Sequence, residues 1–145
     1  MEELRGGADV VLKKIMRQAA AERASDVHIE PGASFVRVRF RKDGLLSDRF
    51  CLSSSMAPNL SVRVKVLGRL DVGESRLPQD GSWAEEIDGV PYDFRISVLP
   101  SMYGETIVIR ILSGRGKFFR KNGVGNRGGA EAVVGRGAFQ GAGGG

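Results

Sequence analysis

Residues 35–44 read FVRVRFRKDG, and this stretch decides the fold class. Apolar residues alternate with arginines in it, which is the pattern of a β-strand with one buried and one exposed face. The pair Asp43-Gly44 then precedes the apolar run 45–52, and Asp-Gly between two such runs is typical of a two-residue hairpin turn. The sequence therefore predicts antiparallel strands over 35–41 and 45–52.

Further strands are predicted on both sides of this hairpin. A short strand covers 26–30 and ends at Pro31-Gly32. The remaining predicted features are three strands at 82–87, 90–99 and 105–112, a second Asp-Gly turn at 88–89, turn residues at 76–81 and a loop at 100–104.

Two helices are also predicted. Residues 9–23 carry apolar side chains at i, i+4 and i+8, and Asp9 is the expected N-cap. Residues 56–70 fit a helix, but Val62, Val64 and Val66 also alternate, so periodicity leaves helix and strand open there. The order of elements predicts an α+β domain with a largely antiparallel sheet. We expect the helices on one face and, on the other, Arg37, Arg39, Arg41 and Arg95.

Charge divides the chain into two unlike segments. The 145 residues include 22 Lys and Arg against 17 Asp and Glu, but positions 1–112 hold 16 of each sign. Residues 113–145 hold the other six basic residues, a single acid and 12 of the 21 glycines. We therefore expect a lead-in at 1–8, a folded domain at 9–112 and a disordered Gly/Arg-rich tail at 113–145.

Composition also narrows the class of protein. A neutral domain argues against a nucleic-acid binder. Cys51 is the single cysteine, no Cys/His cluster has zinc spacing, and no segment is apolar over the roughly 18 residues that a membrane span needs. A cytoplasmic protein without a metal site is the expectation.

Arg95 and Arg110 are the candidate functional residues. Each interrupts an apolar strand close to the expected core, where an unpaired guanidinium is costly. Each should therefore have an anionic partner. That partner is either an internal carboxylate, such as Asp93 or Glu105, or a phosphate from another domain.

Other charged residues have plainer interpretations. The arginines within 35–41 can contact phosphates, but the solvated side of an antiparallel strand is the preferred interpretation. His28 is the only histidine. A structural, hydrogen-bonded role is preferred for it over a general base or a metal ligand.

Four collinear motifs resemble the N-terminal lobe of the hexameric secretion ATPases of type II secretion and type IV pilus assembly. They are ASDVHIEP at 24–31, VRVRFRKDGL at 36–45, RLPQDG at 76–81, and FRISVLPSMYGE with VIRIL within 94–112. The resemblance implies a PAS-like lobe in which residues 56–70 are helical.

The resemblance also implies roles for individual residues. In this family the nucleotide lies between this lobe and a following RecA-like lobe, and the motif positions that contact its phosphates correspond to Arg95 and Arg110. A structural role is implied for the remaining motif residues, which are Asp26, His28, Glu30, Arg76, Pro78, Gln79, Asp80 and Gly81. ATP and Mg²⁺ are implied as cofactors of full-length members. In this chain no Walker motif follows Leu112, so we expect that it binds neither ATP nor Mg²⁺ tightly and does not hydrolyse ATP alone.

The implied partners are the RecA-like lobe, neighbouring subunits of a hexamer and, indirectly, an inner-membrane platform. The protein would then be cytoplasmic and peripheral to that membrane. The tail has the composition of GC-rich DNA read out of frame, with a junction expected between Ser113 and Val124. One alternative is a non-enzymatic domain that docks on ATPase subunits or secretion partners. The last is nucleic-acid binding through the arginine strand face and the basic tail.

Overall fold

A computed structural model describes residues 1–113 of the chain. The elements are β1 (Glu2–Glu3), α1 (Ala8–Glu22), β2 (Asp26–Pro31), β3 (Phe35–Lys42), β4 (Leu45–Ser53), α2 (Met56–Gly68), β5 (Gln79–Ile87), β6 (Val90–Ser101) and β7 (Gly104–Ser113). The predicted α+β class is confirmed. The predicted disorder and frame junction of the tail lie outside the described residues, apart from Ser113.

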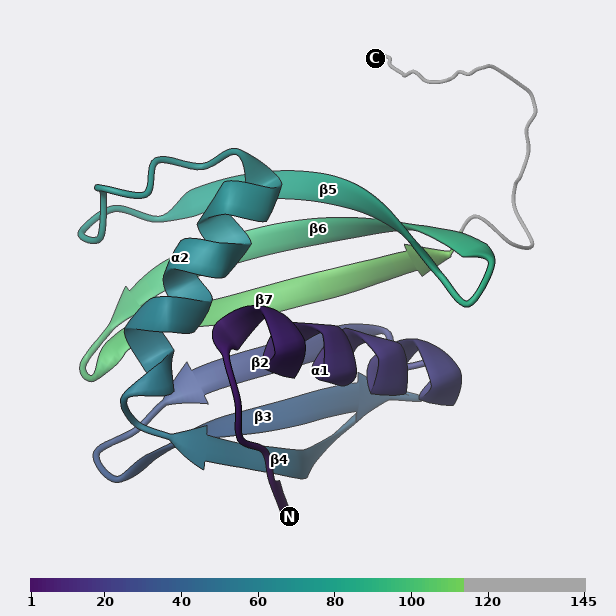
Figure 1. Ribbon diagram of the computed structural model, residues 1–145, viewed down its shortest axis with the longest axis horizontal. Helices are drawn as coiled ribbons and strands as arrows, with labels where there is room; N and C mark the ends of the chain where they lie inside the picture. The colour runs from purple at the N-terminus through teal and green to yellow at the C-terminus, as the bar shows by residue number, and fades with distance from the viewer. Residues whose placement is uncertain (114–145) are drawn as a thin grey trace. The chain divides into compact units, whose positions relative to one another are not determined.

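The strands form one sheet in the order β1-β4-β3-β2-β7-β6-β5 (Figure 1). Strand β2 lies in the middle and pairs antiparallel with both β3 and β7. Strand β1 pairs parallel with β4. It was not predicted, because two residues are too few to show an alternating pattern. One compact unit comprises Met1–Ala84 with Phe94–Leu112, and the hairpin tip Glu85–Asp93 falls outside it.

Both predicted Asp-Gly turns are present. Asp43 and Gly44 have φ of 52° and 80°, and Asp88 and Gly89 have 50° and 79°. Positive φ at both central residues is the geometry of a two-residue hairpin turn whose twist matches that of the flanking strands. The predicted loop at 100–104 is shorter than expected, since only two residues separate β6 from β7.

Helices α1 and α2 lie across the same face of the sheet (Figure 1). The strand residues that face them are buried: Val27, Ile29, Val36, Val38, Phe40, Phe50, Leu52, Phe94, Ile96, Val98, Ile107 and Ile109. The alternating strand residues point to the opposite side, which we call the outer face. This arrangement confirms the expected separation of helices and arginines.

The segment that periodicity left open is helical. Val64 is fully buried, whereas Val62 and Val66 are 46% and 53% exposed. In a strand these three side chains would share one face, so their different burial follows the helical period. Asp9 is not the N-cap of α1: that position is Gly7, and Asp9 lies in the first turn, where a negative charge favours the helix dipole.

Strand β5 approaches the end of α2 very closely at Gly81. A Cβ atom on Gly81 would lie 2.8 Å from the carbonyl oxygen of Gly68 and 2.8 Å from Cδ2 of Leu70. The first of these atoms belongs to the backbone and cannot rotate away. The last residue of the RLPQDG motif is therefore glycine because of packing.

We predict that Gly81→Ala lowers the free energy of unfolding by about 1–3 kcal/mol, the usual cost of overpacking. Gly73→Ala is the matched control, because its Cβ would have only an ordinary contact, 3.5 Å from Asp71 Oδ1. Urea unfolding of both variants measures the difference. Equal stability of the two variants would contradict the packing argument.

Candidate functional site

The outer face is organised around the polar residues of the central strand. In β2, Val27 and Ile29 enter the core, so Asp26, His28 and Glu30 point to the outer face. Strand β3 places Arg41, Arg39 and Arg37 opposite these three residues in the same order. The alternation of both strands thus brings three arginines alongside two carboxylates and one imidazole.

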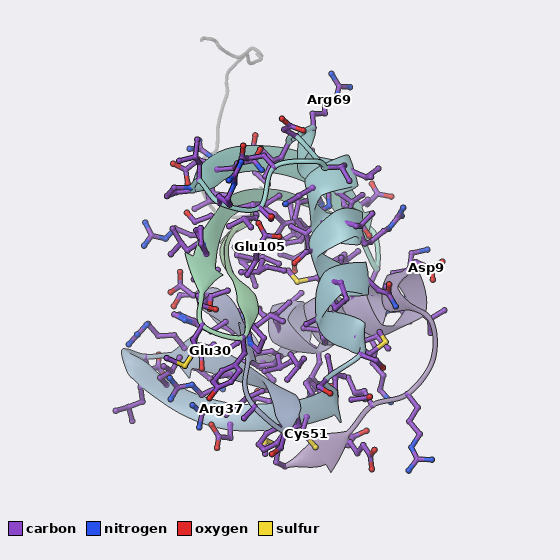
Figure 2. All side chains as sticks on the ribbon, turned by 90° about the vertical axis from the view of Figure 1, so that its left-hand side faces the viewer. Asp9, Glu30, Arg37, Cys51, Arg69 and Glu105 are labelled. Carbon is purple, nitrogen blue, oxygen red and sulfur yellow. The ribbon has the colours of Figure 1, made fainter. Side chains whose placement is uncertain are left out.

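Glu30 pairs with Arg39 and Arg37, and we call these three residues the Glu30 cluster. Arg39 Nη2 donates a hydrogen bond to Glu30 Oε2 at 3.3 Å, and Arg37 Nη2 lies 3.6 Å from Glu30 Oε1. Figure 2 shows Glu30 and Arg37 close together on neighbouring strands. These contacts agree with the preferred interpretation of the β3 arginines, since they have partners within the sheet.

Asp26 holds the second group. Its carboxylate accepts hydrogen bonds from Arg110 Nε at 3.3 Å and from Ser25 Oγ at 2.9 Å. Arg41 Nε forms a longer ion pair with it, at 3.9 Å. The side chain of Asp26 is 10% exposed, against 69% for Arg110 and 39% for Arg41. A nearly buried carboxylate therefore lies between two solvated guanidinium groups.

Arg95 joins this group on the next strand. Arg95 lies six residues before the end of β6, and Arg110 lies six residues after the start of β7. The two strands are neighbours separated by a two-residue turn, so an unbroken antiparallel ladder sets these two arginines opposite each other. Both point to the outer face. The result is one row across four strands, the Asp26 row: Arg95, Arg110, Asp26 and Arg41.

The environment of the two candidate arginines differs from the sequence prediction. Arg95 and Arg110 are exposed on the outer face, so neither guanidinium is close to the core as expected. The internal partner of Arg110 is Asp26, while Glu105 pairs with Lys65. Because alternate strand residues face opposite sides, an arginine between two isoleucines need not be buried.

Within the described residues the His28 imidazole makes no hydrogen bond, so the hydrogen-bonded role predicted for this side chain is not observed. Its Nδ1 lies 3.7 Å from Glu30 Oε2, and its side chain is 19% exposed. Burial lowers the pKa of His28 below the ordinary value of 6.5, because desolvation of the imidazolium outweighs attraction by Glu30 and Asp26. The neutral imidazole is therefore the form that the fold favours.

The RLPQDG loop is held by its own polar groups. Gln79 accepts a hydrogen bond from the Asp71 amide at 2.8 Å and donates to the carbonyl oxygens of Asp71 and Glu74. The Glu74 carboxylate accepts from the amides of Arg76 and Leu77. Four side chains of the motif are exposed, namely Arg76, Leu77, Pro78 and Asp80. These contacts fit the structural role implied for the motif.

Lys65 and Glu105 form a buried ion pair that the sequence analysis missed. Lys65 Nζ lies 3.0 Å from Glu105 Oε1, and the two side chains are 2% and 9% exposed. Lys65 also donates to the carbonyl oxygen of Glu74, which joins α2, the following loop and β7. Glu105 (Figure 2) keeps one carboxylate oxygen without a hydrogen bond. Once 56–68 is known to be helical, the position of Lys65 beside Val64 on the buried side is the signal for this pair.

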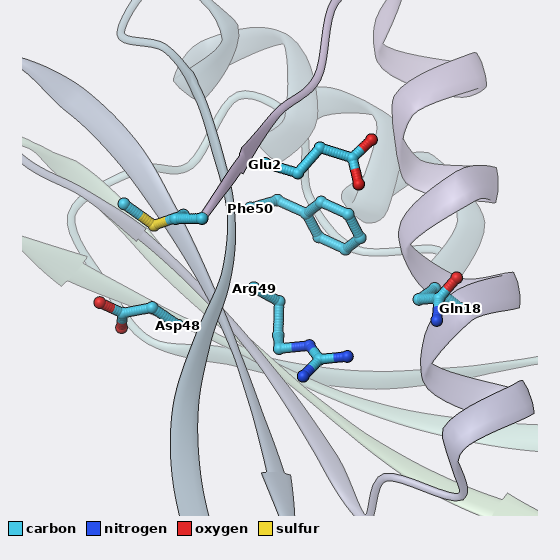
Figure 3. Close-up of a pocket in the computed structure, with 6 residues that line it drawn as sticks. Glu2, Gln18, Asp48, Arg49 and Phe50 are labelled. Atoms are coloured by element: carbon cyan, nitrogen blue, oxygen red, sulfur yellow. The ribbon is translucent and has the colours of Figure 1, made fainter.

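A polar hollow of about 260 Å³ lies at the other end of the sheet, beside β4 and α1 (Figure 3). Its lining residues are Met1, Glu2, Gln18, Asp48, Arg49 and Phe50. Arg49 is tied to Glu22 by an ion pair and stands 5.5 Å from the centre of the Phe40 ring. None of the predicted site residues lies in this hollow.

Two classes of feature are absent from residues 1–113. They contain no group of three or more His, Cys, Asp or Glu side chains that could hold a metal ion. No helix among them is long and apolar enough to span a membrane.

Comparison with known protein families identifies the family to which this chain belongs. The family described as "Type II/IV secretion system protein" matches residues 5–133. The chain belongs to this family of secretion proteins, and it is homologous to the N-terminal region of their ATPases.

Individual relatives are much longer than this chain. The "Protein transport protein HofB homolog" of Escherichia coli K12 is 41% identical over 79% of this chain and 25% of its own length. The "Type II secretion system protein E" of Klebsiella pneumoniae is 41% identical over 70% of this chain and 20% of its own length. The chain thus spans a fifth to a quarter of these relatives. The Legionella pneumophila ATPase DotB shares the fold, with a TM-score of 0.53 at 16% identity over 77% of this chain and 31% of that one.

We predict that stability falls as the pH drops below 6.5, and that His28→Gln weakens this dependence. In the unfolded chain the imidazole takes up a proton near its ordinary pKa of 6.5, whereas the folded state resists until lower pH. Stability is therefore lost between 6.5 and the lower folded pKa. Because His28 is the only histidine and carboxyls titrate near about pH 4, few other groups contribute in this window. The measurement is the urea midpoint of the unchanged chain and of His28→Gln at about pH 7.5 and 5.5. An equal drop in midpoint between the two pH values for both proteins would contradict the prediction.

We predict that Lys65→Met costs about 3–5 kcal/mol of unfolding free energy, because it leaves the Glu105 carboxylate buried without a counter-charge. Adding Glu105→Gln should recover a large part of that loss. Lys14→Met is the control, since Lys14 is 58% exposed and should change stability by less than about 1 kcal/mol. A cost for Lys65→Met no larger than that of the control, measured by urea unfolding, would show that the buried pair is unimportant.

Proposed function

We propose that this chain is the nucleotide-contacting N-terminal lobe of a secretion or pilus-assembly motor ATPase. The observation that supports the proposal is the Asp26 row, in which Arg110 and Arg41 pair with one carboxylate and Arg95 lies opposite Arg110 on the next strand. Like charges on directly opposite strand positions destabilise a sheet unless an anion compensates them. In this pair, Arg110 has such an internal anion in Asp26.

A phosphate is the anion that fits this pair best. Guanidinium groups present a planar fork of donors that matches phosphate oxygens, and they stay charged at any physiological pH. Exposed on the outer face, Arg95 and Arg110 can reach a phosphate presented by a second lobe. In phosphoryl transfer, such fixed cations stabilise the charge that develops on the transferred group.

The proposed role is to bind and orient phosphate, without hydrolysis by this lobe alone. ATP and Mg²⁺ would be held by the RecA-like lobe of the full-length relatives, since residues 1–113 offer no cluster of metal ligands. The partners would be that lobe, neighbouring subunits of a hexamer and, through them, an inner-membrane platform. This proposal places the chain in the cytoplasm.

A docking role without nucleotide contact is the second candidate. The end of β6 and the turn that follows it expose apolar side chains: Leu99 is 40%, Met102 86% and Tyr103 53% exposed. Exposed apolar residues that lie together favour a protein partner. Nucleic-acid binding has less support, because Arg37, Arg39 and Arg41 already have acidic partners within the sheet.

We predict that Arg95→Gln and Arg110→Gln each weaken binding of tripolyphosphate and ATP about tenfold, as expected for loss of a charged hydrogen-bond donor. Arg69→Gln is the matched control, because Arg69 is an exposed arginine at the end of α2, away from the outer face (Figure 2). Isothermal titration of the 145-residue chain measures all three. Binding that is equally weakened by the control would indicate a general charge effect. Capture of a full-length motor without anion binding would favour the docking role.

A further inference from the structure

Asp26 is the only acid in the row of charges that the proposed function assigns to phosphate. It is also one of three buried polar or charged residues among those described, at 7% exposure. Its carboxylate accepts hydrogen bonds from Arg110 and Ser25 and forms the longer ion pair with Arg41. A buried carboxylate with several donors is well compensated, so it is a fixed charge of the fold.

The way Asp26 holds Arg110 matters for ligand binding. The contact is made through Nε of Arg110 at 3.3 Å, while the side chain remains 69% exposed. Within residues 1–113, no acceptor takes a hydrogen bond from the two terminal nitrogens. The side of the guanidinium that binds phosphate bidentately is thus still available.

We propose that Asp26 is the internal counter-ion of the phosphate site and that it limits the affinity of that site. The inference rests on the proposed function. The carboxylate stabilises the lobe when no anion is bound, because it neutralises Arg110 and Arg41 on either side of β2. The same negative charge repels any phosphate that Arg110 binds. Asp26 therefore lowers the affinity of the site for anions and raises the stability of the lobe when no anion is bound.

Electrostatic range separates the effect of Asp26 from that of Glu30. At physiological salt, charges interact over about 8 Å before screening dominates. Glu30 lies four residues further along the same strand, and at about 3.3 Å per residue it is roughly 13 Å from Asp26. Glu30 also neutralises two arginines on the outer face, yet it is outside the range of the pair Arg95 and Arg110. It is a matched control on the same strand and the same face.

The test is isothermal titration of sodium tripolyphosphate into the 145-residue chain and its Asp26→Asn variant. We expect Asp26→Asn to bind about three- to tenfold more tightly, the effect of removing one nearby surface charge. The variant should also melt at lower temperature without tripolyphosphate, and the ligand should raise its melting temperature more than that of the unchanged chain. Glu30→Gln should lower the melting temperature without tightening binding.

The possible outcomes separate this inference from the proposed function. If the unchanged chain binds through Arg95 and Arg110 but Asp26→Asn binds no more tightly, only the counter-ion inference is overturned. Equal tightening by Glu30→Gln would overturn it too, because net charge would explain both variants. If no variant binds tripolyphosphate, the proposed function and the inference both fail.

A measurement on the unchanged chain covers the case in which Asp26→Asn does not fold. Tripolyphosphate should move the NMR signals of the Arg110 Nε–H and the Asp26 carboxyl carbon together, because the phosphate and Asp26 contact opposite sides of the same guanidinium. The carboxyl signal of Glu30 should stay in place. A shift at Arg110 without one at Asp26 would contradict the inference.

Discussion

The carboxylate of Asp26 is the constraint on which the outer face depends. Strand β2 is central, so its side chains must be compatible with neighbours on both sides, and Asp26 meets an arginine on each. Without this charge, Arg41 on β3 and Arg110 on β7 would have no carboxylate between them. With the Asp26 charge in place, the outer face can carry Arg110 on β7 opposite Arg95 on β6. The same residue thus supports the fold and sets the charge of the candidate site.

A second buried charge, that of Lys65, lies on the side of the sheet that the helices cover. Lys65, near the end of α2, contacts both Glu74 in the loop that follows and Glu105 at the start of β7. Strand β7 therefore carries a structural acid on one face and the exposed Arg110 on the other. Gln79 and Gly81 fix the loop from its far end, through hydrogen bonds and close packing. These contacts anchor the start of β7, the strand that carries Arg110, one of the two arginines proposed to bind phosphate.

Local features of the fold were predictable, and long-range pairings were not. The two Asp-Gly turns follow from the backbone preferences of two residues, and the strands follow from their period. The N-cap at Asp9 was wrong because neighbouring residues also satisfy a helix start, and β1 is too short to carry a pattern. The pair Asp26 and Arg110 joins residues 84 positions apart, so it depends on the register between β2 and β7. The burial of Lys65 was not predicted, because it depends on which side of α2 faces the sheet.

The central claim is that Arg95 and Arg110 act on one anion, as their positions on adjacent strands suggest. A double-mutant cycle in tripolyphosphate affinity, with Arg95→Gln, Arg110→Gln and the double variant, tests it most directly. Two residues that bind one phosphate group should be coupled, so the double variant should lose clearly less affinity than the two single losses combined, by at least about 0.5 kcal/mol. Strictly additive losses would show that the two arginines act independently and would contradict the account.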